Sequence, residues 1–180
     1  PERGVPMREG GQCGLNPLVG ISARDRIRIG ASGKIATAFD MARAMAIGAD
    51  YCNSARGFMF SLGCIQSLSC HTDRCPTGVA TQDPTRARAL VVPDKKQRVY
   101  NYHEATLHAL GELVAAAGLD HPQQIRPIHL SHRISTTEVV SFAQLYPELK
   151  PGELLQETTN DPRFREAWKL AQPESFAPKG

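Results

Sequence analysis

Three of the five cysteines of this chain lie within twelve residues, at Cys64, Cys70 and Cys75. Thiolates bind soft metals, and three on one short loop can converge on a single centre once turn residues fold the loop back. The stretch from Cys64 to Pro84 has no apolar period and is punctuated by Gly78 and two prolines. We therefore expect a loop held by something other than a hydrophobic core, namely an iron–sulfur or zinc site. The alternative is three reduced cysteines that pack as small apolar side chains.

The composition narrows the class of protein. A chain of 180 residues with 41% hydrophobic and 22% charged residues suits one globular domain. A net charge of +3 without a basic run gives no support for a nucleic-acid partner. There is neither a run of eighteen apolar residues nor a signal-peptide pattern, and the uneven cysteines favour a reducing compartment, so we expect a cytoplasmic protein. The chain begins at Pro1, so we expect part of a larger protein and leave open a membrane anchor before Pro1.

The segment from residue 26 to residue 48 predicts a strand followed by a helix. Polar and apolar residues alternate over 26–29, as in a short strand, and small residues at 31–33 break the pattern. Thr37 and Asp40 have the spacing of side chains that bind the first free N–H groups of a helix. Gly48 stands where a left-handed cap would end that helix.

A second unit of the same kind follows directly. Residues 50–54 are long enough for a strand, and residues 55–57 turn into a helix that continues to residue 65. Two consecutive strand–helix units predict a parallel sheet. Each loop after a strand is rich in small residues and leads into a helix start, where backbone N–H groups and the helix dipole favour a phosphate. Each loop by itself also fits a plain tight turn.

The rest of the chain is predicted to be mainly helical. Apolar residues keep helical spacing from Val99 to Ala117, and a second amphipathic helix is predicted from Ser135 to Tyr146. Phe164 and Trp168 predict a short anchored helix near residues 161–172. The basic residues between 86 and 98 are interpreted as solvated surface.

The remaining cysteines and five of the histidines are assigned no site. Cys13 is expected to be a buried thiol, and Cys52, inside the second strand, is expected in the core. The histidines lack ligand spacing and are interpreted as surface or satisfied side chains: His103, His108, His121, His129 and His132.

Two stretches carry a resemblance to a known family. ASGKIATAFDMARAMAIGADYCNSARG and GCIQSLSCHTDRCPTGVATQDP resemble the FMN-binding synthase domain of glutamate synthase, and more closely its shorter FMN-binding relatives. The likeness covers residues 3–92 and weakens to about residue 150. It implies an α/β fold, the C-terminal part of a (β/α)8 TIM-type barrel at 1–92 with an iron–sulfur loop at 64–84. A helical extension at 93–150 and a tail at 151–180 follow.

The resemblance also implies cofactors and their ligands. Cys64, Cys70 and Cys75 match the ligands of a 3Fe–4S cluster, each thiolate binding one iron. His71 raises a Cys3His zinc site as the competing reading, against which the likeness argues. The implied FMN phosphate loops consist of Ser32, Gly33 and Lys34, and of Ala55, Arg56 and Gly57. The first loop departs from many flavin barrels, which have Asp-Gly-Gly where this chain has Ala31-Ser32-Gly33. The backbone N–H donors of the loop are unaffected by that difference.

The implied activity is reductive amination of 2-oxoglutarate to L-glutamate, with FMN as hydride donor and electrons from ferredoxin or an NADPH-linked subunit. One alternative is N-methylglutamate synthase-like amination with an alkylamine. Another is a non-catalytic electron-transfer or zinc-stapled module. A whole barrel takes about 250 residues, so the substrate half is expected before Pro1 and this part alone is expected to be inactive. No catalytic acid or base is assigned within it.

Overall fold

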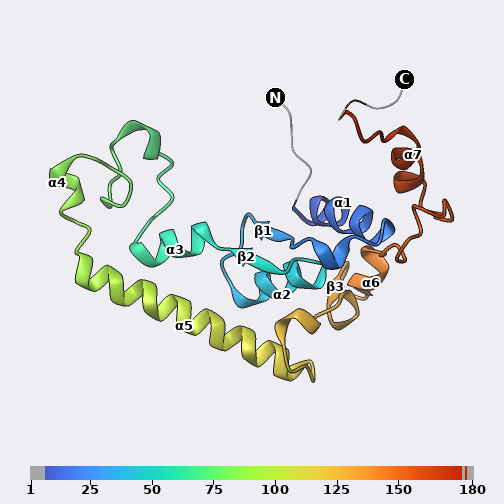
Figure 1. Ribbon diagram of the computed structural model, residues 1–180. Coiled ribbons are helices and arrows are strands. Elements are labelled where there is room, and N and C mark those ends of the chain that lie inside the picture. Colours follow the sequence, from blue (N-terminus) through green and yellow to red (C-terminus); the bar gives the residue numbers. More distant parts are fainter. Residues whose placement is uncertain (1–6, 176, 178–180) are drawn as a thin grey trace. The chain divides into compact units, whose positions relative to one another are not determined.

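The structure is a computed structural model that describes residues 7–175 and 177, with helices and two small sheets (Figure 1). The chain forms two compact units. Unit 1 contains the residues up to 31, residues 46–51 and the residues from 126 onward. Unit 2 contains residues 32–45 and 52–125. The mixed α/β class is confirmed.

The first helix of unit 1 is α1 (Met7–Gly20). The helix is fixed by a buried amide rather than by apolar contacts alone. The Asn16 side-chain oxygen accepts a hydrogen bond from the Leu149 N–H at 2.9 Å, and its Nδ2 donates to Gln12 Oε1 at 2.8 Å. Because the partner lies 133 residues away, local sequence could not show this bond. Cys13 lies exposed on α1, so its expected burial was wrong.

The order strand, helix, strand, helix is confirmed, with a shifted first strand. Strand β1 (Gly30–Ser32) pairs with β2 (Tyr51–Asn53), and helices α2 (Ala38–Ala46) and α3 (Ala55–Leu62) follow them in turn. The strand predicted at 26–29 was wrong, because 3-10 helix η1 (Arg24–Arg26) occupies its beginning.

The carboxylate of Asp50, a side chain that is 10% exposed, explains why residues 26–29 do not pair as a strand. Asp50 Oδ2 accepts a hydrogen bond from the Ile29 N–H at 2.7 Å and forms an ion pair with Arg24 at 2.9 Å. Asp50 Oδ1 also binds Arg28 at 3.3 Å. The segment therefore folds around the Asp50 side chain. Its alternation of arginine and isoleucine reflects these contacts with Asp50 and not the two-residue repeat of a β-strand.

Both predicted ends of α2 are confirmed. Asp40 Oδ2 accepts a hydrogen bond from the Thr37 N–H at 3.0 Å, while the Asp40 N–H donates to Thr37 Oγ1 at 3.2 Å. This reciprocal pair is a capping box. After the helix, Gly48 has φ 105°, a left-handed conformation that L side chains rarely adopt. A Cβ there would also lie 2.6 Å from Leu15 Cδ2.

Unit 2 is built on α3 and the long helix α5 (Val92–Ala116), which pack against each other (Figure 1). The rings of Phe58 and Tyr102 meet edge to face, with centroids 5.0 Å apart. The predicted long helix is confirmed and begins seven residues before Val99. Between α3 and α5 the chain forms η2 (Cys70–Thr72) and the short α4 (Pro84–Ala87), and η3 (Pro122–Gln124) follows α5.

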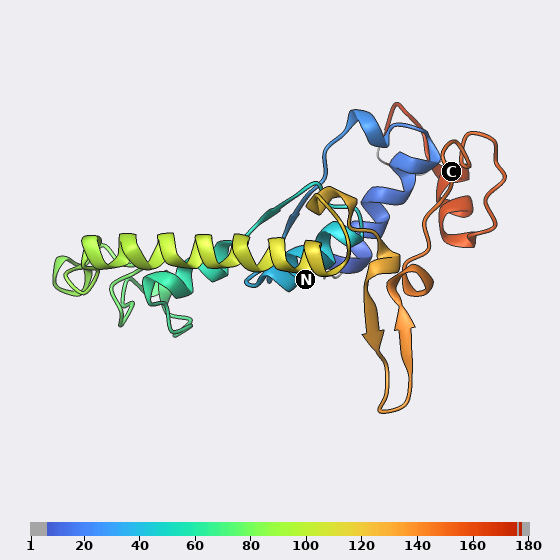
Figure 2. The ribbon, with the colours of Figure 1, turned by 90° about the horizontal axis from the view of Figure 1, so that it is seen from below.

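The second predicted amphipathic helix was wrong. After η4 (Pro127–His129), strands β3 (Ser131–Arg133) and β4 (Val139–Ser141) form an antiparallel hairpin, seen in Figure 2. Its register pairs His132 with Val140. Ser135 Oγ accepts hydrogen bonds from the N–H groups of Thr137 and Glu138, at 3.3 and 3.1 Å. The side chain thus stabilises a hairpin turn instead of a helix start, and only α6 (Phe142–Leu145) is helical.

The last part of unit 1 contains the predicted anchored helix. α7 (Pro162–Leu170) begins after Asp161, whose carboxylate accepts a hydrogen bond from the Arg163 N–H at 3.0 Å. Phe164 is buried in a cluster with Leu149 and Leu154, and Trp168 packs against that cluster. Both predicted anchors are confirmed. Among the helices of the described residues, none combines the length and apolarity needed to cross a bilayer.

Candidate functional site

The two predicted phosphate loops are neighbours in unit 2. Ser54, just before the second loop, donates through Oγ to the carbonyl of Ile35, just after the first, at 2.8 Å. Tyr102 donates through its hydroxyl to the next carbonyl, that of Ala36, also at 2.8 Å. The Ser54 and Tyr102 hydroxyl oxygens lie 3.0 Å apart. The structure therefore brings together segments that are about twenty residues apart in the chain.

The first loop has an open, left-handed backbone. Ser32 ends β1, and the next two residues have positive φ, 119° at Gly33 and 55° at Lys34. All three residues are exposed, and no atom lies within 4 Å of the place a Cβ of Gly33 would take. A bulky group can therefore approach the backbone here, with the Lys34 ammonium nearby to supply positive charge.

The second loop is the first turn of α3 rather than a separate loop. Ser54 is the N-cap residue, yet its side chain makes no capping hydrogen bond; its hydroxyl donates to the Ile35 carbonyl instead. The first-turn N–H groups thus receive no bond from the usual capping oxygen. Ala55 and Arg56 are exposed, and Gly57 is buried. Uncapped N–H groups, the positive end of a helix dipole and the Arg56 guanidinium suit an anion such as a phosphate group.

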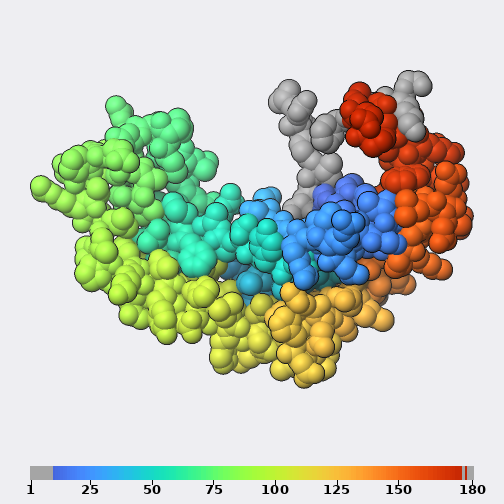
Figure 3. All heavy atoms as spheres, viewed as in Figure 1, coloured from blue at the N-terminus to red at the C-terminus, as the bar shows by residue number. Residues whose placement is uncertain are grey.

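The three clustered cysteines lie on one segment but differ in environment. Cys64 follows Gly63, the left-handed cap of α3, and is half-buried; Cys70 opens η2 and is exposed; Cys75 is buried. Within the described part of the chain, no group of three or more His, Cys, Asp or Glu side chains is arranged to hold a metal ion. The three-thiolate ligand set therefore stays a prediction from spacing and resemblance, and so does the competing zinc centre with His71. Figure 3 shows much of the green segment after α3 at the surface.

The surroundings of Cys75 favour a thiolate. A hydrogen bond from the Thr77 side chain, 3.5 Å away, and bonds from the N–H groups of Ala80, Thr77 and Val79 lower the pKa of Cys75 to about 7. Donors arranged around a sulfur stabilise its charged form. The thiolate is also the form that binds metals. The lowered pKa of Cys75 thus favours the thiolate form that a metal ligand requires.

A side-chain clamp missed by the sequence reading closes the Cys75 loop. Asp73, with φ 60°, accepts hydrogen bonds through Oδ1 from the Gln82 N–H at 2.6 Å and from the Thr81 hydroxyl at 2.9 Å. These bonds hold the pKa of Asp73 below its ordinary value. Asp83 caps α4 by accepting a bond from the Thr85 N–H at 2.8 Å. The Asp83-Pro84 pair is a helix-start signal that sequence reasoning could have found.

Among the side chains that were assigned no site, the five histidines follow expectation and the two cysteines do not. All five of those histidines are exposed, and the Nδ1 atoms of His121 and His129 accept hydrogen bonds from backbone N–H groups. Cys52 is only half-buried rather than in the core, and burial raises the pKa of its thiol.

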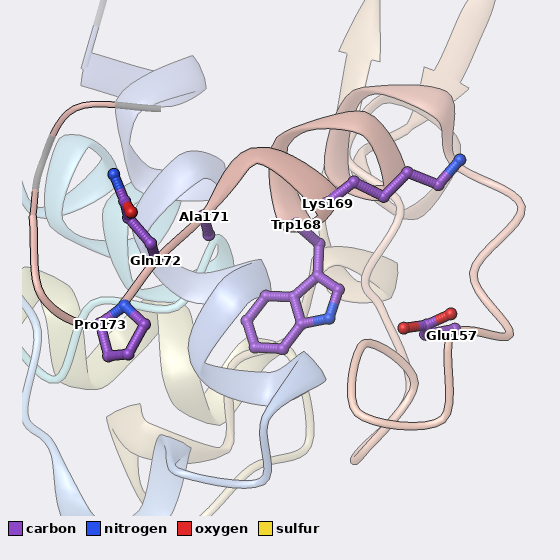
Figure 4. A pocket seen from close by; sticks show the side chains of 6 residues that line it. All are labelled: Glu157, Trp168, Lys169, Ala171, Gln172 and Pro173. Atoms are coloured by element: carbon purple, nitrogen blue, oxygen red, sulfur yellow. The ribbon is translucent and has the colours of Figure 1, made fainter. Parts of the chain in front are cut away.

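A separate pocket lies in unit 1, far along the chain from the predicted site residues. It has a volume of about 660 Å³ and is lined by Glu157, Trp168, Lys169, Ala171, Gln172 and Pro173. In Figure 4 the Trp168 indole lies between Pro173 and Glu157, whereas Lys169 extends away from the ring. None of the residues predicted for FMN or for a cluster lines it.

Comparison with known proteins agrees with the sequence resemblance. The family model described as a conserved region in glutamate synthase matches residues 2–120. The chain is 43% identical over 122 residues to the glutamate synthase large subunit-like protein YerD of Bacillus subtilis, covering 68% of this chain and 23% of that protein. It is 36% identical over 103 residues to an archaeal glutamate synthase [NADPH] of Methanocaldococcus jannaschii, covering 57% and 20%.

A third relative has a different electron donor in its name. The ferredoxin-dependent glutamate synthase of Pyropia yezoensis is 39% identical over 72 residues, covering 39% of this chain and 5% of that protein. The chain thus spans less than a quarter of the length of each of these relatives. Both predicted phosphate loops and the whole cysteine segment lie inside the matched region, and on that match the chain belongs to the glutamate synthase family.

Proposed function

We propose that this chain is part of an FMN-dependent oxidoreductase of the glutamate synthase type, which aminates 2-oxoglutarate to L-glutamate. One observation carries the proposal: the turn at Ser32–Lys34 and the uncapped start of α3 are joined through Ser54, which donates to Ile35 at 2.8 Å. An exposed pair of backbone loops with positive charge at Lys34 and Arg56 supports a phosphate monoester as ligand.

Each residue would have a distinct task toward FMN. The first-turn N–H groups of α3 would donate to phosphate oxygens, and the open face of Gly33 would let the group approach the backbone. Arg56 would add a bidentate guanidinium and Lys34 a point charge. FMN, when bound, supplies the hydride chemistry, and this chain's residues orient it by its phosphate end. The finer fold proposal is that these loops belong to the C-terminal part of a (β/α)8 barrel, where phosphate sites follow the last strands.

For the cysteine segment we propose the 3Fe–4S ligand set Cys64, Cys70 and Cys75. The depressed pKa of the Cys75 thiol supports it, because ligation requires a thiolate. The other two sulfurs would have to approach Cys75 when a cluster is inserted, since metal binding and the folding of a loop are coupled. No step of the amination is assigned to these residues.

The partners proposed are 2-oxoglutarate, an ammonia or amine source and an electron donor. The names of relatives include both NADPH and ferredoxin, so either class of donor is compatible with the family. Amination with an alkylamine, as in an N-methylglutamate synthase, is the second candidate. A zinc-stapled or purely electron-transferring module is the third.

The test uses the natural polypeptide, purified anaerobically and reduced with dithionite. Addition of 2-oxoglutarate with ammonium should reoxidise bound flavin near 450 nm and yield glutamate, detected by mass spectrometry. N-methylglutamate from methylamine, with no glutamate from ammonium, would favour the second candidate. A colourless protein that contains zinc and no flavin would overturn the proposal.

A further inference from the structure

We propose that Tyr102 of α5 is a positioning residue that holds the two phosphate loops together and thereby makes the site selective for a phosphorylated flavin. The inference rests on the proposed function and extends it to a residue outside both loops. Tyr102 reaches the first loop through Ala36, 66 positions earlier in the chain, and the second through Ser54, 48 positions earlier. One side chain thus contacts the segments next to both loops.

The count of hydroxyl protons makes this arrangement specific. Three contacts at 2.8, 2.8 and 3.0 Å connect Ser54 Oγ, Tyr102 Oη and the carbonyls of Ile35 and Ala36, but the two hydroxyls carry only two protons. When each hydroxyl donates to its carbonyl, both carbonyls are satisfied and the Ser54 hydroxyl is drawn away from capping α3. The N–H groups at the start of α3 then receive no side-chain cap and can donate to a ligand.

The packing of the Tyr102 ring fixes the position of its hydroxyl. Its ring lies edge to face with Phe58, one residue after the second loop, with centroids 5.0 Å apart. A Cβ at Gly57 would overlap Tyr102 Oη and would lie 2.7 Å from Ser54 Oγ. The absence of a side chain at Gly57 is therefore explained by the tyrosine, and the hydroxyl in turn occupies the space beside the first turn of α3.

The expected consequence concerns the phosphate rather than the flavin ring. Loss of the Tyr102 hydroxyl leaves the Ala36 carbonyl without its donor, while Ser54 still donates to the Ile35 carbonyl. One of the two links between the flanks of the loops is then lost, so the loops should separate or tilt and the N–H groups at the start of α3 should no longer face the phosphate. Binding of a flavin without a phosphate does not use those groups.

The experiment measures the affinities of the natural polypeptide, stripped of flavin, for FMN and for riboflavin by fluorescence titration. Tyr102→Phe keeps the ring and removes only the hydroxyl. We expect FMN to bind about tenfold more weakly, equivalent to about 1.4 kcal/mol, and riboflavin to change by less than about twofold. Tyr100→Phe is the matched control, because Tyr100 lies on the same helix and is 58% exposed; it should change neither affinity.

Each outcome has one meaning. Unchanged FMN affinity in Tyr102→Phe, or an equal loss for FMN and riboflavin, would overturn the positioning role while leaving the proposed function standing. If Tyr102→Phe does not fold, Ser54→Ala serves instead, because it removes the second hydroxyl of the link and should weaken FMN selectively in the same way; equal losses for both ligands would again overturn the inference. Failure of the unaltered protein to bind FMN would overturn the proposed function itself.

Discussion

Asp73 Oδ1 lies 2.6 Å from the backbone nitrogen of Gln82, and this hydrogen bond closes the segment that contains Cys75. Asp73→Ala should release the segment and disperse the N–H groups that surround the sulfur. The pKa of the Cys75 thiol, lowered to about 7 in the closed loop, should then rise toward its ordinary value of 9.0. The measurement is the pH profile of iodoacetamide alkylation at Cys75 in metal-free protein, followed by peptide mass spectrometry.

The control for that measurement is Asp25→Ala, which removes an exposed aspartate of η1. It should leave the Cys75 profile where it was. An unshifted profile in Asp73→Ala would show that the clamp does not organise the thiolate.

Substitution of alanine for two glycines of α1 should change the free energy of unfolding in opposite directions. Nothing lies within 4 Å of a Cβ at Gly14, so Gly14→Ala should stabilise unit 1 by about 0.5–1 kcal/mol through helix propensity. A Cβ at Gly20 would lie 2.5 Å from Leu154 Cγ, so Gly20→Ala should destabilise by about 1–3 kcal/mol through overpacking. Urea unfolding of both variants checks the pair, and equal shifts in the same direction would contradict the packing described for Leu154.

The Asp50 carboxylate should make stability depend on pH at the acidic end. Burial alone would raise the pKa of Asp50, but hydrogen bonds from Arg24, from the Ile29 N–H and from Arg28, with the Arg24 charge, lower it below 3.8. A depressed carboxyl pKa stabilises the fold fully above the unfolded value, about 3.9, and the contribution disappears as the pH falls through the folded value.

Asp50→Asn should therefore lower the free energy of unfolding by about 2 kcal/mol at pH 7, and by progressively less below about pH 4. Urea unfolding at pH 7 and pH 3 measures the difference, with Asp25→Asn as the control that costs little at either pH. A cost for Asp50→Asn that is the same at both pH values would exclude the charged contacts as its source.

Serine substitutions in the cysteine segment test the proposed cluster ligands. Cys64→Ser, Cys70→Ser and Cys75→Ser should each lower the iron and acid-labile sulfide of anaerobically purified protein, because a three-iron centre has one protein thiolate for each iron. Cys13→Ser, at an exposed cysteine outside the segment, should keep both contents. Full iron content after any one of the three substitutions would remove that residue from the ligand set.

The sequence predicted best where the governing contacts are local. The capping box of Thr37 and Asp40, the left-handed Gly48 and the long helix α5 all follow from spacing within one or two turns. The predicted helix from Ser135 was wrong because one local pattern can fit two different structures. Ser135 and Glu138 have the spacing of a helix start, but the same serine hydroxyl serves equally well in a hairpin turn.

Contacts between distant segments were not predictable in this way. The pattern at 26–29 looked like a strand because nothing in it reveals that Asp50 binds Arg24 and Ile29. The two phosphate loops could be proposed from their small residues, whereas the Tyr102 hydroxyl that joins their flanks lies 66 positions from Ala36. Tyr102 had the helical spacing of a packed residue, and its hydrogen bonds gave no signal along the sequence.

The proposed function requires the turn at Gly33 and the start of α3 to hold the phosphate of FMN. Calorimetric titration of the flavin-free natural polypeptide with FMN and with riboflavin measures that contribution. We expect FMN to bind at least about a hundredfold more tightly than riboflavin, equivalent to about 2.7 kcal/mol from charge-assisted bonds, and Arg56→Ala to reduce this ratio of affinities. Equal affinities for FMN and riboflavin, unaffected by Arg56→Ala, would contradict the proposed function.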